Sequence, residues 1–249
     1  MLSTSRFRSL RKSTMRDLLL TRGFSESGTM YVLHRSLQVF GIDFQASQSG
    51  GKYTINICFT YDFIPSCVSY KRKPFDEFGV LDFCLYRRLN NLRGQTREPW
   101  TPYGADDLGC RNLLECRGRE ALEESAKLED EWRDPGYFVK LIPPDLLKRR
   151  CEYVDTVLKL ELPPFAEGPP FECDKEAGDI FTVWAGGGAE NVPLLLVFSA
   201  LQIGNRRAAR EYADIAIRFL SGGDSYREVL ALLRRLKAKA VGNAAVPRP

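Results

Sequence analysis

Apolar and polar residues alternate along residues 38–63, on both sides of a pair of glycines. A period of two is typical of a strand with one buried face, and Gly50-Gly51 suits a two-residue hairpin turn. The pattern therefore predicts a β-hairpin around which the rest of the chain is organised. Its apolar positions are Phe40, Ile42, Phe44 and Ala46 in the first run and Tyr53, Ile55, Ile57, Phe59, Tyr61 and Phe63 in the second.

The register of this hairpin follows if Ser49 lies opposite Lys52. Apolar residues then face one another across the two strands, and a slip of one residue would destroy this arrangement. The predicted pairs are Ala46 with Ile55, Phe44 with Ile57, Ile42 with Phe59 and Phe40 with Tyr61. The other face is expected to be a polar, outward face that carries Asp43, Gln45, Thr54 and Asn56.

Elements on either side of the hairpin follow from the same periodicities. Apolar residues at three-to-four spacing predict helices over residues 5–22, 111–133, 145–160, 190–203, 205–219 and 225–236. Asn205 is expected to cap one of these helices, and Pro143-Pro144 to open another. Alternating residues predict two further strands, over 30–36 and 80–88, the latter with Leu81, Phe83 and Leu85 inward.

The fold class that these elements predict is α+β. We expect an antiparallel four- to five-stranded sheet, with helices on one face and a C-terminal helical layer. A proline-rich connector, LPPFAEGPPFECDKEAGD, is the best candidate for a subdomain boundary. The sequence thus predicts an α+β domain over residues 1–165 and a helical subdomain over 176–249 that packs on it.

The net charge of +4 comes from one segment. Residues 1–24 contain six basic residues against Asp17 alone, so the remainder of the chain is slightly acidic. A basic helical face can bind phosphates, and a nucleic-acid-binding protein is therefore one functional hypothesis. The Arg- and Ser-rich start also resembles a transit peptide, but it runs directly into the first strand, which favours a native helix.

Other features of composition bear on the compartment. The longest apolar run, near residues 192–203, is too short and too interrupted for a membrane span. The seven cysteines are scattered and none forms a Cys-x-x-Cys motif, which favours a reducing cytoplasm. We therefore expect a cytoplasmic protein with no membrane partner.

Catalytic signatures are missing from the sequence. It contains no G-x-S-x-G, H-E-x-x-H or Walker motif and no Cys–His pair at a recognisable spacing. His34 is the single histidine, so a two-histidine metal site is excluded; a structural role for it is favoured over a catalytic one. We expect a protein without catalytic residues, metal or cofactor.

The densest acidic segment is the helix expected over residues 115–134. Some of its charge supports the helix through i,i+4 pairs, Glu115 with Arg119 and Glu123 with Lys127. The remaining carboxylates, without obvious helical partners, form an acidic stripe. The predicted partner-binding residues are Glu120, Glu124, Glu129, Asp130, Glu131 and Asp134 on this helix, together with Asp43, Gln45, Thr54 and Asn56 on the polar sheet face.

Residues 5–135 resemble a bacterial family known as domain of unknown function 4304. The resemblance rests on a first helix that ends LLLTRGF, the strand MYVLHRS, the hairpin GIDFQASQSGGKYTINICFTYDF and the exit CLYRRLNNLRGQTREPW. Members of such families often occur beside secreted toxins and look like immunity proteins, which neutralise a toxin by binding it. The resemblance therefore implies a non-catalytic cytoplasmic binding protein with a protein toxin as partner, and binding of nucleic acid is the alternative.

Overall fold

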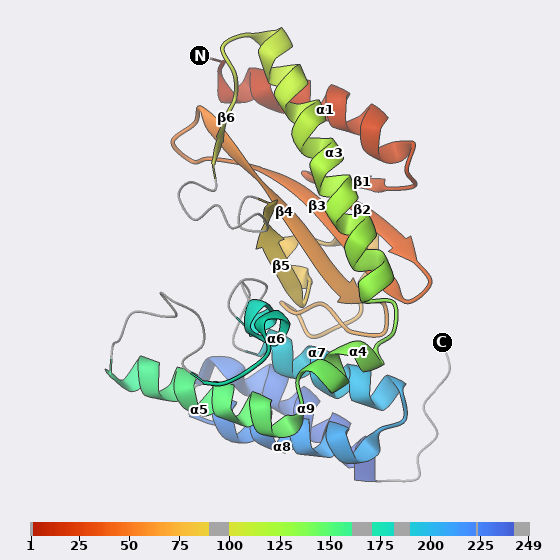
Figure 1. Ribbon diagram of the computed structural model, residues 1–249, viewed down its shortest axis with the longest axis vertical. Coiled ribbons are helices and arrows are strands. Elements are labelled where there is room, and N and C mark those ends of the chain that lie inside the picture. The colour runs from red at the N-terminus through yellow and green to blue at the C-terminus, as the bar shows by residue number, and fades with distance from the viewer. Residues whose placement is uncertain (1, 90–99, 161–170, 182–189, 223, 242–249) are drawn as a thin grey trace. The chain divides into compact units, whose positions relative to one another are not determined.

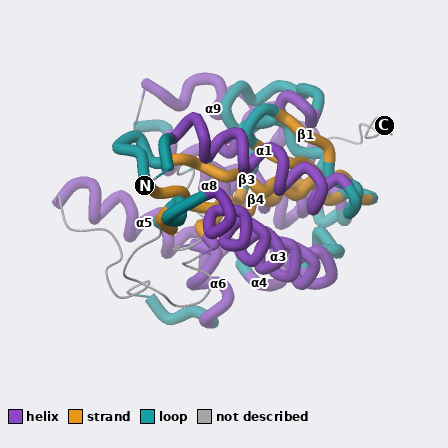
Figure 2. The backbone as a smooth tube through the Cα atoms, turned by 90° about the horizontal axis from the view of Figure 1, so that it is seen from above, coloured by secondary structure: helices purple, strands orange, loops and turns teal. Residues whose placement is uncertain are grey.

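The structure is a computed structural model that describes residues 2–89, 100–160, 171–181, 190–222 and 224–241. Its chain divides into two compact units, Met1–Arg133 and Asp134–Pro249. In Figure 2 the strands are orange and the helices purple, and within the described residues every strand belongs to the first unit. The fold is α+β, as the sequence predicts, but the division falls after Arg133 and not at the proline-rich connector.

The first unit contains an open antiparallel sheet. Its strands are β1 (Ser25–Ser27), β2 (Met30–Arg35), β3 (Gln38–Ala46), β4 (Lys52–Tyr61), β5 (Leu85–Arg88) and β6 (Thr101–Pro102). Strands β1 to β5 follow one another across the sheet, and β6 pairs with β4 beside β5. The long β3–β4 hairpin is therefore the centre of the unit (Figure 1).

The hairpin differs from its predicted register by two residues. Phe44 lies opposite Ile55, Ile42 opposite Ile57 and Phe40 opposite Phe59. The turn is also longer than Gly-Gly, because the Ser47 amide donates to the Lys52 carbonyl at 2.9 Å and so leaves four residues in the loop. A shift of two residues keeps every side chain on its face and still pairs apolar residues with apolar residues, so alternation alone cannot exclude it. The predicted register is wrong, and the predicted apolar face is confirmed.

Helices α1 (Thr4–Leu20) and α3 (Asp107–Glu131) cover this apolar face, which we call the first face (Figure 1). The Phe7 ring of α1 lies with its centroid 5.0 Å from that of Tyr53 in β4, and it also stacks on Tyr103 with centroids 4.1 Å apart. At the other end, the Tyr61 hydroxyl donates to the Trp132 carbonyl at 2.8 Å, and the indole packs on Phe59. Aromatic contacts thus fix both helices to the hairpin.

The opposite face, which we call the second face, is also covered along much of its length. Residues 64–84 fold over it with two short 3-10 helices, Phe75–Glu77 and Val80–Asp82. Phe78 and Phe83 from this segment pack with apolar residues of the sheet, namely Met30, Val32, Val39 and Cys58. Two predictions are therefore wrong: the strand expected over 80–88 is shortened to β5, and Leu81 is exposed rather than inward.

The second unit is built from helices. Those of the described part are α4 (Gly136–Leu141), α5 (Pro144–Leu160), α6 (Lys175–Asp179), α7 (Asn191–Gln202), α8 (Arg206–Leu220) and α9 (Arg227–Val241). The expected cap of α8 is confirmed, since Asn205 Oδ1 accepts from the Ala208 amide at 3.1 Å. Buried Tyr212 of α8 donates its hydroxyl proton to the Ile142 carbonyl at 2.6 Å, which joins α8 to the end of α4.

Candidate functional site: a polar pocket on the second face

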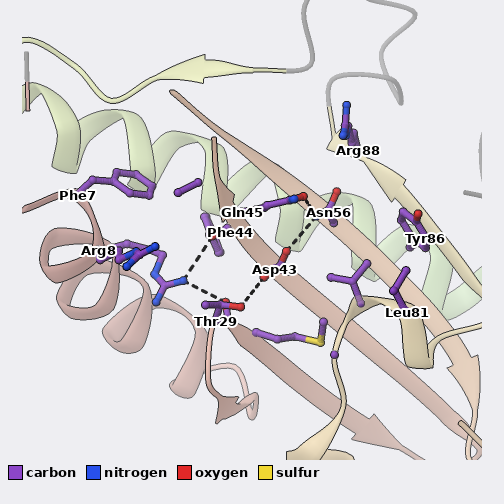
Figure 3. A pocket seen from close by; sticks show the side chains of 15 residues that line it. Phe7, Arg8, Thr29, Asp43, Phe44, Gln45, Asn56, Leu81, Tyr86 and Arg88 are labelled. Carbon is purple, nitrogen blue, oxygen red and sulfur yellow. Dashed lines mark hydrogen bonds between the residues drawn. The ribbon is translucent and has the colours of Figure 1, made fainter. Parts of the chain in front are cut away.

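A cavity of about 520 Å³ opens at the end of the second face that residues 64–84 leave uncovered. One wall comes from α1, the floor from β3 and β4, and the other wall from Gly79–Leu81 and β5 (Figure 3). The lining residues that carry polar groups are Arg8, Arg11, Thr29, Asp43, Gln45, Asn56, Tyr86 and Arg88. Cavities of this size hold small molecules or a side chain of a partner.

A hydrogen-bonded network forms the floor. The register places Asp43 directly opposite Asn56. Asp43 Oδ1 accepts from Thr29 Oγ1 and Asp43 Oδ2 from Asn56 Nδ2, both at 3.0 Å, and Asn56 Nδ2 also donates to Gln45 Oε1 at 3.3 Å. Asp43 is 4% exposed and Asn56 is 2% exposed. Both carboxylate oxygens are therefore engaged, and the carboxylate holds Thr29 and Asn56 in fixed orientations.

Burial dominates the electrostatics of Asp43. It raises the pKa of the carboxyl group above its ordinary value, because the charged form loses its hydration. The hydrogen bonds from Asn56 and Thr29 and the positive charge of Arg11 act in the opposite direction, without cancelling the effect of burial. An ionisable group in this state within a cavity is a common mark of a functional site.

Arg11 reaches the pocket from α1, where its guanidinium is buried. Strand β2 begins at Met30, opposite Asp43, so the last residues of β3 have no neighbour on that side. At this open edge, Arg11 Nη1 donates two long hydrogen bonds, to the Phe44 and Thr29 carbonyls, at 3.4 Å each. Arg11 Nε is buried and has no hydrogen-bond partner in the part of the chain that the structure describes.

Two further arginines stand at the rim. Arg8 is exposed, and no carboxylate of the described residues pairs with it. Arg88 of β5 lies with its guanidinium carbon 5.4 Å from the centroid of the Trp100 ring. The described lining thus contains three guanidinium groups and one carboxylate, so the pocket attracts anions.

The structure brings only part of the predicted polar face to this site. Asp43, Gln45 and Asn56 line the pocket, whereas Thr54 is buried on the same face and is not among the lining residues. The expectation of an outward face is wrong for Asp43, Thr54 and Asn56, because residues 64–84 cover much of this face and Arg11 of α1 reaches over its end. Gln45 alone of the four is exposed.

The six predicted acidic residues lie outside the pocket, and each has a partner. On α3, Glu120 pairs with Arg117, Glu124 with Lys127, Glu129 with Arg35 and Asp130 with Arg133, while Glu131 accepts from the Trp132 indole. Asp134, in the second unit, accepts from the Gly136 amide. Glu120, Glu124 and Asp130 thus have partners on or just after the helix, whereas Glu129 pairs with Arg35 of β2, so the expectation that the group includes carboxylates without helical partners holds for Glu129. The predicted pairing of Lys127 with Glu123 is wrong, since Lys127 pairs with Glu124. Their role in partner binding stays a prediction.

The basic residues of the first helix are also partly engaged. Arg6 pairs with Asp107, Lys12 with Glu26, and Arg11 lies in the pocket. Arg8, Arg16 and Arg22 have no ion-pair partner within the described residues. The basic face expected from the sequence is thus reduced to three arginines.

Other groups capable of chemistry do not converge on the pocket. His34 Nε2 lies 3.4 Å from Asp62 Oδ2, at the far end of β2. The Cys67 and Cys84 thiols lie 3.4 Å apart within the covering segment. No cluster of three or more His, Cys, Asp and Glu side chains suited to a metal ion occurs in the part of the chain that the structure describes. Nor does any helix there have the length and apolar character to cross a membrane.

Sequence reasoning missed Arg8, Arg11, Thr29 and Arg88 as members of one site. They come from a helix, a turn and an edge strand that are far apart in the sequence. The available signal was an aspartate and an asparagine at inward positions of a central hairpin, since buried polar groups in a strand need partners. The pattern was instead interpreted as a surface.

Comparison with curated proteins gives no match, and comparison with solved structures gives none. A family model does match part of the chain, and this confirms the resemblance noted in the sequence. The match takes in Thr29, Asp43, Gln45, Asn56 and Arg88, but it begins beyond the wall that Arg8 and Arg11 provide. Residues 15–101 of this chain match the family described as Domain of unknown function (DUF4304).

Proposed function

We propose that this chain is a non-catalytic binding protein that neutralises a cognate protein toxin by direct binding in the cytoplasm. The observation that carries the binding role is the Asp43–Asn56–Thr29 network on the floor of an accessible pocket. Burying a carboxylate costs free energy that folding alone does not recover, so such a group is more readily understood as part of a binding site. The resemblance to domain of unknown function 4304, a family of the kind whose members look like immunity proteins, supports the toxin as partner.

The rim of the pocket suits contact with a protein. Leu81, on the wall opposite α1, is 58% exposed, and Arg8 on α1 and Gln45 on the floor are exposed as well. Exposed apolar groups together with arginine are typical of protein interfaces. The partner would place a side chain in the pocket and cover Leu81.

The test is binding to the product of a toxin reading frame next to the gene for this chain. We expect a complex in gel filtration, and protection of cells that express the toxin. In titration calorimetry, the Arg8→Glu/Leu81→Ser variant should bind at least about tenfold more weakly, since hot-spot residues contribute 2 kcal/mol or more. Arg16→Glu, on the same helix but outside the pocket lining, is the matched control. A toxin that forms no complex with the wild-type protein would overturn the proposal.

The acidic face of α3 is a further proposed contribution to this interface. Reversing Glu120, Glu124 and Asp130 to Lys should slow association with the toxin in a salt-dependent manner, because electrostatic complementarity acts mainly on the association rate. Circular dichroism checks that the triple variant keeps its fold. An unchanged association rate would restrict the interface to the pocket.

Binding of nucleic acid is the second candidate function. It is supported by Arg8, Arg16 and Arg22, the arginines of the first helix region that have no ion pair in the described structure. A gel-shift titration at two salt concentrations tests it, since phosphate contacts make affinity fall steeply with salt. Equal weak retention of the Arg8→Glu/Arg16→Glu/Arg22→Glu variant and the wild type would reject this function.

A further inference from the structure

One donor of the pocket is buried without an acceptor. Arg11 Nη1 makes two long hydrogen bonds, whereas Arg11 Nε is buried and has no partner among the described residues. A buried donor without a partner costs about 1–3 kcal/mol, and native structures leave few of them. The guanidinium of Arg11 is therefore prepared for an acceptor that the described residues do not supply.

Gln45 adds a second kind of donor. Its Oε1 accepts from Asn56, so its amide Nε2 remains available to donate at the mouth of the pocket. The rim arginines, Arg8 and Arg88, add positive charge on opposite walls. Asp43 contributes the one carboxylate of the described lining, and each of its oxygens already accepts a hydrogen bond, from Thr29 and from Asn56.

The volume of the pocket and its apolar lining indicate what the rest of the ligand must be. A bare phosphate or carboxylate would fill a small part of a cavity of about 520 Å³. The remaining walls include Phe7, Val80 and Leu81, which are apolar. The ligand must therefore combine an oxyanion with an apolar body.

We propose that the pocket binds a small organic molecule whose oxyanion, a phosphate or a carboxylate, contacts Arg11 between the rim arginines while its apolar body lies against Val80 and Leu81. This activity goes beyond toxin neutralisation, because it belongs to the isolated protein and requires no second protein. It uses the same pocket, so a bound small molecule would compete with a partner's side chain for Arg8.

Four probes, tested on the full-length protein, distinguish the contribution of the oxyanion to binding from that of the apolar body. Phenyl phosphate and benzoate carry the two oxyanions on the same ring, inorganic phosphate lacks the apolar body, and benzyl alcohol lacks the charge. We expect phenyl phosphate or benzoate to bind with a Kd at or below about 1 mM, the weak end of small-ligand affinity. Binding is measured by calorimetry and by the fluorescence of the tryptophans, since Trp100 lies over Arg88. Whichever of the two binds identifies the oxyanion.

Variants link the binding to the pocket. Arg8→Gln/Arg88→Gln should weaken binding of the stronger probe at least about tenfold, as expected for the loss of hydrogen bonds to a charged group. Arg11→Lys keeps the charge but loses the planar fork, and should also weaken binding. Arg16→Gln/Arg22→Gln removes two charges outside the lining and should leave affinity within about twofold.

Three results would overturn the proposal. These are an absence of binding by both charged aromatic probes, equal binding by benzyl alcohol, and unchanged affinity in Arg8→Gln/Arg88→Gln and Arg11→Lys. Circular dichroism of each variant shows whether it has folded, and the double rim variant keeps the test decisive if Arg11→Lys does not fold. The toxin complex is measured in a separate experiment, so failure of one proposal leaves the other open to its own test.

Discussion

Asp43 is held by two side-chain hydrogen bonds, yet burial still raises the pKa of its carboxyl group above the ordinary value of 3.8. Arg11 lowers this pKa through its charge, but the loss of hydration has the larger effect. Cys58, farther along the same face, has its own pKa raised by burial and by the charge of Asp43. The ionised carboxylate is therefore a destabilising component of a network that positions Thr29 and Asn56.

Because burial raises the pKa of Asp43, the stability of the protein depends on pH in a defined direction. At pH values between the unfolded and the folded pKa of Asp43, the native state binds more protons than the unfolded state. The stabilising contribution of Asp43 to folding is therefore fully present below about pH 3.8 and is lost as pH rises through the folded pKa. The Asp43→Asn variant lacks this titration. We expect the free energy of unfolding of the wild type, measured relative to Asp43→Asn by urea titration, to fall as pH rises from below 3.8. A constant difference, or one that grows with pH, would contradict the assignment.

Phe44 represents the opposite case, an apolar residue whose burial the sequence predicts. Its side chain is 1% exposed, and its ring packs edge-on against Tyr31. Truncating Phe44→Ala should lower the free energy of unfolding by about 3–5 kcal/mol, because it removes apolar burial and leaves a cavity. The control is Val68→Ala at an exposed position, expected within about 0.5 kcal/mol of wild type. A loss below about 1 kcal/mol for Phe44→Ala would show that the first face is loosely packed.

At the scale of elements, alternation predicted the apolar face of the hairpin but not what lies over the other face. The covering segment, residues 64–84, has no regular period. Polar residues on one face of a strand do not indicate whether a loop covers that face. Gly41 was the available signal, since a glycine within a strand often marks a close approach. A Cβ built on Gly41 would lie 2.8 Å from Phe83 Cζ and 3.0 Å from Met30 Sδ.

Gly41 therefore tests whether the second face is closed. The Gly41→Ala substitution places a methyl group against a ring that packs in the core, and overpacking of this kind costs about 1–3 kcal/mol. The expected result is a lower urea midpoint with an unchanged dependence on urea. Gly222→Ala provides the control, because no atom lies within 4 Å of a Cβ at that position. If Gly41→Ala is as stable as wild type, the segment does not pack on the strand as the structure has it.

Register shows a second limit at this scale. Two registers that differ by two residues keep the same faces and both pair apolar residues, so the sequence pattern cannot choose between them. The choice depends on the loop, where Gly50 and Gly51 both adopt φ of 74° and the Gly50 amide donates to the Ser47 carbonyl. The six helices that the sequence predicts, in contrast, correspond to α1, α3, α5, α7, α8 and α9, because caps and periodicity are local features, whereas the short helices α4 and α6 were not predicted. The pocket could not be predicted, because its walls meet only in the folded chain.

At the scale of the molecule, the chain divides at the end of α3 rather than in its proline-rich connector. Trp132 completes the first unit, with its carbonyl bonded to Tyr61 and its ring on Phe59. Asp134-Pro135 follows immediately, and proline just beyond a helix is a signal for its end. The connector is richer in proline, but composition indicates where a chain is irregular and does not indicate which helices pack together. Helices α4 and α5 pack with α7 and α8, which assigns them to the second unit.

This assignment predicts how two fragments will behave. Residues 1–133 contain the sheet, both covering helices and all of the described pocket lining, so this fragment should fold alone and unfold cooperatively in urea. Residues 1–165, the domain suggested by the connector, would add α4 and α5 without the helices that cover them. Phe138 and Leu147 would then be exposed, at about 1.5–3 kcal/mol of lost burial each. We therefore expect the longer fragment to associate in gel filtration and the shorter one to remain monomeric. A longer fragment that is monomeric, while residues 1–133 fail to fold, would show that α4 and α5 belong with the sheet.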